Sequence, residues 1–105
     1  MNLVEQISLV SIEYAQDDLG EWTETRSDNY VFATIESVSA SEFYNAGLQG
    51  LKPEYRAVIY MVEYNGEELV ELFGKIYNVY RTYRRNDGRI ELYLNEKKGD
   101  ENDDT

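Results

Sequence analysis

The side chains able to do chemistry in this chain are carboxylates and a tyrosine–arginine group, because the sequence contains neither cysteine nor histidine. That composition excludes disulfides, thiol nucleophiles, imidazole bases and Cys/His zinc sites. Three acidic pairs, Asp17-Asp18, Glu67-Glu68 and Asp103-Asp104, fall in expected turns or near the C-terminus, where water solvates both carboxylates. A catalytic pair would instead face one substrate across a cleft. We therefore predict no catalytic residue, no metal site and no cofactor.

Tyrosine and arginine alternate in a second group, Tyr80-Arg-Thr-Tyr-Arg-Arg85. On a strand such a pattern can stack bases and hold phosphates, which is typical of a single-stranded nucleic-acid-binding module. Tyrosine and arginine are also enriched at protein interfaces. Strict alternation predicts that Arg81 and Tyr83 share a strand face with Lys75, Tyr77 and Val79.

Charge is distributed unevenly along the 105 residues, which carry a formal net charge of −11. The first 50 residues hold nine acidic residues and one basic residue, whereas residues 75–89 hold five basic residues and one acidic residue. The overall negative charge opposes binding to nucleic acid. An acidic mimic of a DNA duplex, which would inhibit an enzyme, is a second alternative, although the carboxylates follow no regular phosphate-like spacing.

Alternating apolar residues between turn residues predict a mainly β fold, a small barrel of six or seven strands. Expected inward sets are Val31, Ala33 and Ile35, and Ile90, Leu92 and Leu94. Turns are predicted at residues 17–20 and, as hairpin signals, at Asn65-Gly66 and Asp87-Gly88. The expected strands are Ile7–Tyr14, Trp22–Arg26, Tyr30–Val38, Tyr55–Tyr64, Glu68–Phe73, Lys75–Tyr83 and Arg89–Leu94.

One segment, residues 40–49, is predicted to be a short helix between two strands. Ser39 and Glu42 have the spacing of a capping box, in which each side chain bonds the other residue's amide. The helical stripe of apolar and small residues is expected to face the sheet; it comprises Ala40, Phe43, Tyr44 and Gly47. Residues 1–95 form one predicted domain, and residues 96–105 a disordered acidic tail.

Two further patterns concern membranes and export. The sequence has no run of eighteen apolar residues, and its first residues lack the basic start of a signal peptide. We therefore expect a soluble protein without a membrane span or a cleaved leader.

An ordered set of segments resembles the head closure proteins (head–tail joining, connector or stopper proteins) of tailed bacteriophages. The set begins with Val38–Tyr55, a strand end followed by a helix rich in serine, glutamate and small residues. It continues with Glu63–Glu67, Gly74–Tyr83 and Asp87–Tyr93, which supply an Asn-Gly turn, a Gly-x-x-Tyr strand followed by arginine, and a closing strand. The resemblance covers roughly residues 5–95.

The resemblance implies a β-barrel with one short helix and a structural, non-enzymatic role. Such a protein assembles with itself into a dodecameric ring beneath the portal and adaptor proteins. The ring closes the double-stranded DNA channel after packaging, without sequence-specific binding, and offers a platform to the tail terminator or tail completion protein. It implies a place in the virion neck, after assembly in the host cytoplasm, and no membrane partner.

Two sets of candidate functional residues follow. A closed ring of identical subunits needs a heterologous interface, and the acidic first half facing the basic strand of the next subunit is one such pairing. The candidate interface residues are Lys75, Arg81, Tyr83, Arg84, Arg85, Phe43 and Tyr44. The candidate channel or gating residues are acidic and lie within residues 15–29: Asp17, Asp18, Glu21, Glu24 and Asp28. The helix region, residues 39–54, is the alternative source of the channel or ring contacts.

Overall fold

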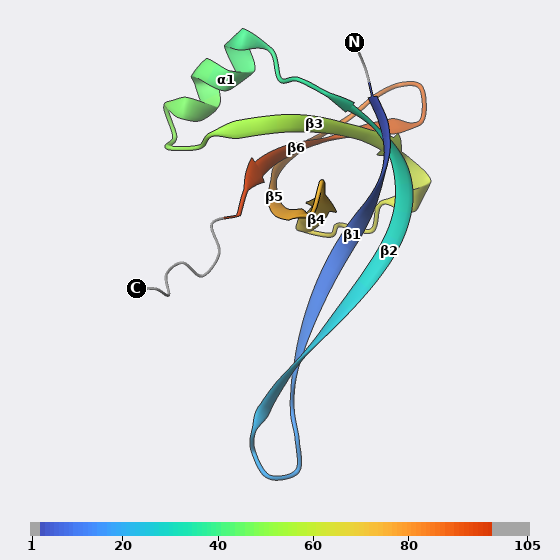
Figure 1. Cartoon of the computed structure of the whole chain (residues 1–105), viewed down its shortest axis with the longest axis vertical. Helices are drawn as coiled ribbons and strands as arrows, with labels where there is room; N and C mark the ends of the chain where they lie inside the picture. The colour runs from blue at the N-terminus through green and yellow to red at the C-terminus, as the bar shows by residue number, and fades with distance from the viewer. Residues whose placement is uncertain (1–2, 98–105) are drawn as a thin grey trace.

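A computed structural model describes residues 3–97, whose strands form a closed antiparallel barrel (Figure 1). Neighbouring strands follow the order β1-β2-β3-β6-β5-β4, and β4 closes the barrel on β1. This confirms the predicted mainly β fold with one short helix between strands. The elements are β1 (Leu3–Gln16), β2 (Trp22–Glu36), α1 (Ala40–Gly47), β3 (Pro53–Tyr60), the 3-10 turn η1 (Met61–Glu63), β4 (Leu69–Leu72), β5 (Lys75–Arg84) and β6 (Arg89–Glu96).

Alternate residues of the strands fill the barrel interior with apolar side chains. The two inward sets predicted for β2 and β6 are confirmed, because all six residues are buried in one cluster. Strands β1, β3, β4 and β5 complete that cluster with Ile7, Leu9, Ala57, Ile59, Val70, Leu72 and Tyr77. A side chain on a strand of this kind faces either the core or the outer surface. The barrel is therefore a packed core, and its chemistry lies on the outside.

Two predicted connections between strands differ in the structure. The strands expected at Trp22–Arg26 and Tyr30–Val38 are the single strand β2, because Ser27, Asp28 and Asn29 pair with β1 instead of turning. The hairpin predicted at Asn65-Gly66 is wrong, since β3 pairs with β2 and β6 and not with β4. The chain leaves β3 after Tyr60, where the Met61 amide donates to the Gly88 carbonyl at 2.9 Å.

The other hairpin turns are tight. The turn predicted at Asp87-Gly88 joins β5 to β6, with Gly88 at φ 85° and a 2.8 Å bond from the Arg85 amide to the Arg89 carbonyl. A turn at Phe73-Gly74 joins β4 to β5, and both residues have positive φ. Sequence reasoning missed Phe73 as a turn residue because aromatic residues rarely adopt φ near 54°. Its ring packs edge-on against Tyr55.

The helix α1 packs beside β3 on the outside of the barrel (Figure 1). Ser39 Oγ accepts a hydrogen bond from the Glu42 amide at 3.1 Å, as half of the capping box requires. The other half is wrong, because the Glu42 carboxylate accepts from side chains of β5. The predicted apolar face is also wrong: Phe43 and Tyr44 are 53% and 66% exposed, and Ala46 is the buried residue of α1. The barrel surface beneath α1 is polar, so it binds Glu42 and not the aromatic rings.

The chain's end departs slightly from the expected boundary. Glu96 is the last residue of β6 and not the start of a tail. The remainder of the predicted disordered tail, residues 98–105, lies outside the described residues. Within residues 3–97, the only α-helix is far too short and polar to cross a membrane.

The packed interior makes a stability prediction. Leu92 is fully buried in the core cluster, so we expect Leu92→Ala to lower the free energy of unfolding by about 2–5 kcal/mol. Leu19→Ala is the matched control, because Leu19 is exposed in a turn and its loss should change stability by less than about 0.5 kcal/mol. Denaturant unfolding of both variants measures the difference, and equal effects would contradict the assigned core.

Candidate functional site

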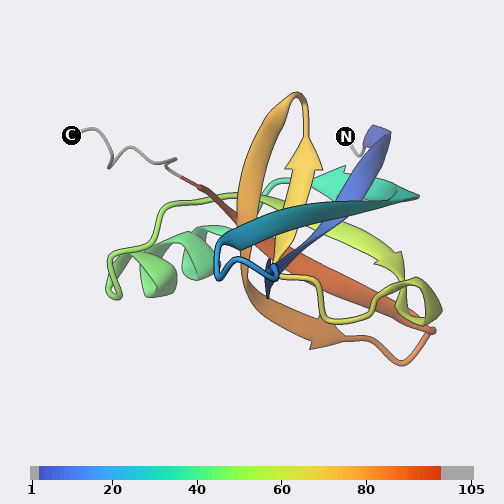
Figure 2. The same cartoon turned by 90° about the horizontal axis from the view of Figure 1, so that it is seen from below.

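The most prominent surface feature is a hairpin that projects from the barrel (Figure 1). β1 pairs with β4 only at Ser8–Val10, and β2 pairs with β3 only at Thr34–Glu36, yet β1 and β2 pair with each other over their whole lengths. Residues 11–27, here named the arm, therefore form a two-stranded ribbon that has no third strand in the described structure. Figure 2 views the molecule along the arm from its tip.

A local network shapes the tip of the arm. Asp17 Oδ1 accepts from the amides of Leu19 and Glu21 at 2.9 and 2.8 Å, and Gly20 adopts φ 87°. This confirms the predicted turn at residues 17–20. Asp17 is therefore a structural residue of the tip. The carboxylates of Asp18 and Glu21, in contrast, accept no hydrogen bond from residues 3–97.

Arg26 anchors the base of the arm. It donates to Asp28 at 2.8 and 2.9 Å and also pairs with Glu71 of β4, while Ser8 Oγ donates to Asp28 at 2.6 Å. The Arg26 hydrogen bonds, assisted by Ser8, hold the pKa of the Asp28 carboxyl below its usual value. Asp28 thus belongs to the arm's attachment, apart from the other four predicted channel residues.

Those four carboxylates, on Asp17, Asp18, Glu21 and Glu24, all lie on the arm. No lysine or arginine of residues 3–97 comes within ion-pair distance of any of them. The structure therefore brings together most of the predicted channel set as one acidic projection.

The two faces of the arm differ. The first, here named its apolar face, carries the large apolar side chains of Ile12, Tyr14 and Trp22 among polar ones, and the second carries no large apolar side chain. Cross-strand pairing places Ile12 beside Arg26, Tyr14 beside Glu24 and Gln16 beside Trp22 on the first face. The second face carries short or polar residues: Ser11, Glu13, Ala15, Thr23, Thr25 and Ser27. At the tip, Leu19 and Trp22 are 86% and 69% exposed. Where the apolar face meets β4 and β5 it borders a groove of about 470 Å³ lined in part by Val10, Leu69 and Ile76.

The basic strand β5 differs from its predicted pattern because it contains a β-bulge. Val79 lies opposite Leu94 and Arg81 lies opposite Tyr93, so Tyr80 is the extra residue. The bulge reverses the alternation. Tyr77 and Val79 consequently pack on the core, whereas Arg81 lies outside over the Tyr93 ring, 4.1 Å from its centroid. The prediction that Arg81 and Tyr83 share a face with the upstream residues is wrong.

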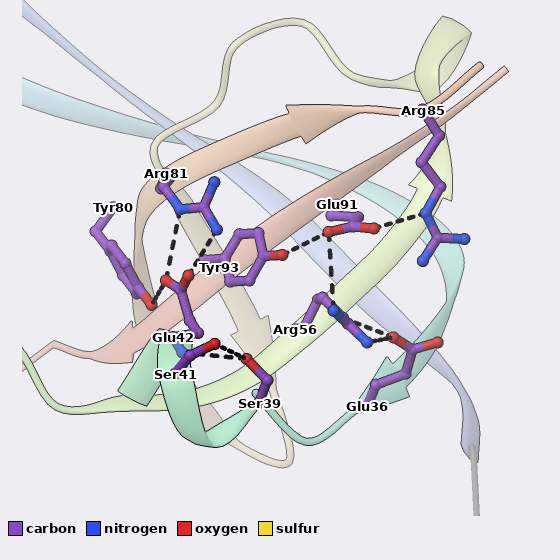
Figure 3. Close-up of polar contacts among 10 residues, drawn as sticks. All are labelled: Glu36, Ser39, Ser41, Glu42, Arg56, Tyr80, Arg81, Arg85, Glu91 and Tyr93. Carbon is purple, nitrogen blue, oxygen red and sulfur yellow. Dashed lines mark hydrogen bonds and ion pairs between the residues drawn. The ribbon is translucent and has the colours of Figure 1, made fainter. Parts of the chain in front are cut away.

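Arg81 joins β5 to the helix (Figure 3). The Glu42 carboxylate accepts from Arg81 Nη2 at 2.6 Å and from the Tyr80 hydroxyl at 2.7 Å. The Arg81 hydrogen bond lowers the pKa of Glu42 against the opposing effect of burial. Burial and the Glu42 carboxylate together raise the pKa of Tyr80. This cluster, which we name the helix clamp, holds α1 against the barrel.

A second cluster surrounds Glu91, a carboxylate with only 7% of its surface exposed (Figure 3). Glu91 accepts from Arg85 Nε at 2.7 Å and from the Tyr93 hydroxyl at 2.5 Å. Burial acts to raise its pKa, but the hydrogen bonds from Tyr93 and Arg85 outweigh burial and leave the pKa below its ordinary value. Arg56 lies 3.9 Å from Glu91 and also bonds Glu36 of β2. The cluster ties β2, β3 and β6 to one another and to the β5–β6 turn on the outer side of the barrel.

The predicted interface residues therefore separate into three groups. Arg81, Arg85 and Lys75 pair with carboxylates of the same chain. Arg84 has no carboxylate of residues 3–97 within ion-pair distance, and Tyr83 beside it is exposed. Phe43 and Tyr44 lie apart from both, on the outer face of α1.

Arg84 pairs with Ile90, which pairs on its other side with Ile59, so this end of the barrel also carries residues that sequence reasoning missed. Arg89 lies over the ring of Tyr60, and Val62 is exposed on the 3-10 turn that bonds to Gly88. We name this surface the turn end: Tyr60, Val62, Tyr83, Arg84 and Arg89. Arg89 belongs to the basic run of the sequence, but no sequence pattern brings residues 60–62 to the β5–β6 turn.

No group of acidic side chains in the described part of the chain could hold a metal ion. A scan against protein-family models and a search of curated proteins give no match to this chain. Function must therefore be inferred from the arm, the turn end and the charge of the molecule.

The helix clamp predicts a pH-dependent stability. Because the pKa of Glu42 is lowered from 4.5 in the folded protein, its contribution is complete above that value and disappears as pH falls through the lowered pKa. We expect Glu42→Gln to reduce the free energy of unfolding by about 1–2 kcal/mol at neutral pH and the deficit to vanish in acid. Glu54→Gln, at an exposed site, is the control. A deficit that persists at low pH would contradict this role.

Proposed function

We propose that this protein is a head closure protein of a tailed bacteriophage. In this role it forms a ring below the portal and adaptor, closes the DNA channel after packaging and carries the docking face for the tail. The observation that supports this role best is a filled six-stranded barrel from which one long acidic arm projects. The resemblance of residues 5–95 to this family adds to that observation.

A filled barrel suits a building block. Its interior is occupied by thirteen buried apolar residues, so the described barrel offers its outer surface, not an internal cavity, to other molecules. That surface includes a strand pair extending well past the barrel and a short helix with exposed aromatic residues. Exposed apolar groups of this kind are typical of protein contact sites.

The arm's charge suits a protein that surrounds DNA without binding it. Carboxylates repel phosphates, whereas affinity for DNA depends on lysine and arginine neutralising phosphates. Four carboxylates of the arm have no lysine or arginine of residues 3–97 within ion-pair distance, and the whole chain carries −11. We propose that the arms border the channel, and that the arm carboxylates not engaged by a neighbouring subunit face the DNA and leave it able to slide.

The structure weakens one support for the nucleic-acid-binding alternative. Stacking and phosphate binding by β5 would need its arginines available to the ligand. Arg81 and Arg85 are instead occupied by Glu42 and Glu91. The head closure role does not require Arg81 and Arg85 to be free to bind nucleic acid.

The proposed role predicts a defined assembly defect. In the phage that encodes this chain, removing the protein should give filled heads that lose DNA and carry no tails, as seen by electron microscopy and by nuclease sensitivity of the packaged DNA. Supplying the wild-type chain in trans should restore tailed particles. Normal tailed particles in its absence would refute the proposal.

The two alternative functions are tested with the purified protein. A shift of single-stranded DNA by the purified protein at physiological salt would favour a nucleic-acid-binding module. Inhibition of a nuclease or restriction enzyme by the purified protein would favour a DNA mimic.

A further inference from the structure

We propose that the arm of one copy docks on the turn end of a second copy. The occupant of the turn end is thus residues 11–27 of an identical chain, with Leu19 and Trp22 lying against Tyr60, Val62 and Tyr83. This inference deepens the proposed function. Its interpretation as the contact between neighbouring subunits of the ring rests on that proposed function.

The first reason is that the arm lacks partners of its own. A two-stranded hairpin is only marginally stable in water unless another strand or surface covers it. No third strand covers residues 11–27 in the described chain, although one face carries Ile12, Tyr14 and Trp22. Burying Leu19 and Trp22, both largely exposed, would remove apolar surface from water and order the ribbon.

The second reason is charge complementarity. Asp18, Glu21 and Glu24 of the arm have no lysine or arginine of residues 3–97 within ion-pair distance. The side chains of Arg84 and Arg89 at the turn end have no carboxylate of the same range within that distance, and the one carboxylate of the turn itself, on Asp87, accepts from the Arg89 amide. In a molecule of net charge −11 such a positive site is scarce. The arm therefore offers acidic and apolar groups together, and the turn end offers basic and apolar groups together.

The third reason is position. The arm leaves the bottom of the barrel in Figure 1, whereas the β5–β6 turn lies at the upper right, and the two are also apart in Figure 2. One chain therefore cannot join its own arm to its own turn end, but two copies can. The contact is heterologous, with different surfaces on the two copies, which is the type of contact that generates rings.

A second apolar surface, on the outer face of α1, fits the arm less well. It comprises Phe43, Tyr44 and Leu48 beside a groove of about 690 Å³. No lysine or arginine is among the residues that line this groove, so it cannot neutralise the arm's carboxylates. It serves below as the competing site.

Cysteine cross-linking tests the contact directly, because the chain contains no cysteine. Full-length Leu19→Cys is mixed with Val62→Cys carrying a mass tag, under mild oxidation at low ionic strength. A disulfide traps even a briefly populated contact, so we expect the mixed dimer to form faster than either homodimer. Leu19→Cys with Leu48→Cys is the control. Equal yields from both mixtures, or a higher yield with Leu48→Cys, would overturn the proposal.

Charge reversal tests the same contact by a second route. Arg84→Glu, placed in the Val62→Cys chain, should slow mixed-dimer formation about tenfold, and Asp18→Lys in the Leu19→Cys chain should restore it. Asp18 is chosen because Asp17 holds the tip's turn together. Lys52→Glu makes the same charge change away from the turn end and should have no effect. An unchanged rate in Arg84→Glu would also overturn the proposed contact.

The two proposals fail separately. Absent cross-linking together with tailless particles in the deletion strain would refute the arm contact alone. Specific cross-linking together with normal tailed particles would refute the head closure role and leave a self-associating protein.

Discussion

The register of the β1–β2 hairpin is the constraint on which the rest of the structure depends. Ile7 lies opposite Val31, and Leu9 and Ala33 face the core on the same side of the pair. A slip of one residue would turn an inward set outward. The same register continues past the barrel for the length of both strands. Since side chains alternate with a period of two, the core's alternation also decides which residues share each face of the arm. The arm's apolar face is thus a consequence of the way the barrel is filled.

The outer surface of the barrel explains how a chain of charge −11 maintains a compact form. Five basic residues pair with carboxylates inside the chain: Arg26, Arg56, Lys75, Arg81 and Arg85. Arg56 and Arg85 stabilise the nearly buried Glu91, and Arg81 stabilises Glu42 of α1. A buried carboxylate without such partners would be strongly destabilising. Most of the basic run is therefore used for folding, and the two arginines of the run that pair with no carboxylate of residues 3–97, Arg84 and Arg89, lie at the turn end.

Local patterns predict much of this fold because they act over a few residues. The inward sets of β2 and β6, the Ser39 cap and the Asp87-Gly88 turn all follow from alternation or turn chemistry. The missed features are decided by residues far apart in sequence. The bulge at Tyr80 depends on the fit of β5 against β6, and Glu42 leaves its capping box for Arg81, 39 residues away. The turn end likewise depends on a bond between Met61 and Gly88.

A docking arm of this construction would link folding of the arm to assembly. Ordering a marginal ribbon opposes binding, so a single arm contact between two free copies is expected to be weak. In a closed ring every copy both gives and receives an arm, and the last contact closes between surfaces already held near each other. The effective concentration of these two surfaces is then far above the concentration of free subunits.

Added salt screens the exposed charges and weakens each contact further. Such a subunit remains separate in solution and associates where a template, such as a portal complex, gathers the copies. This behaviour is what a protein that must close a channel only after packaging would need.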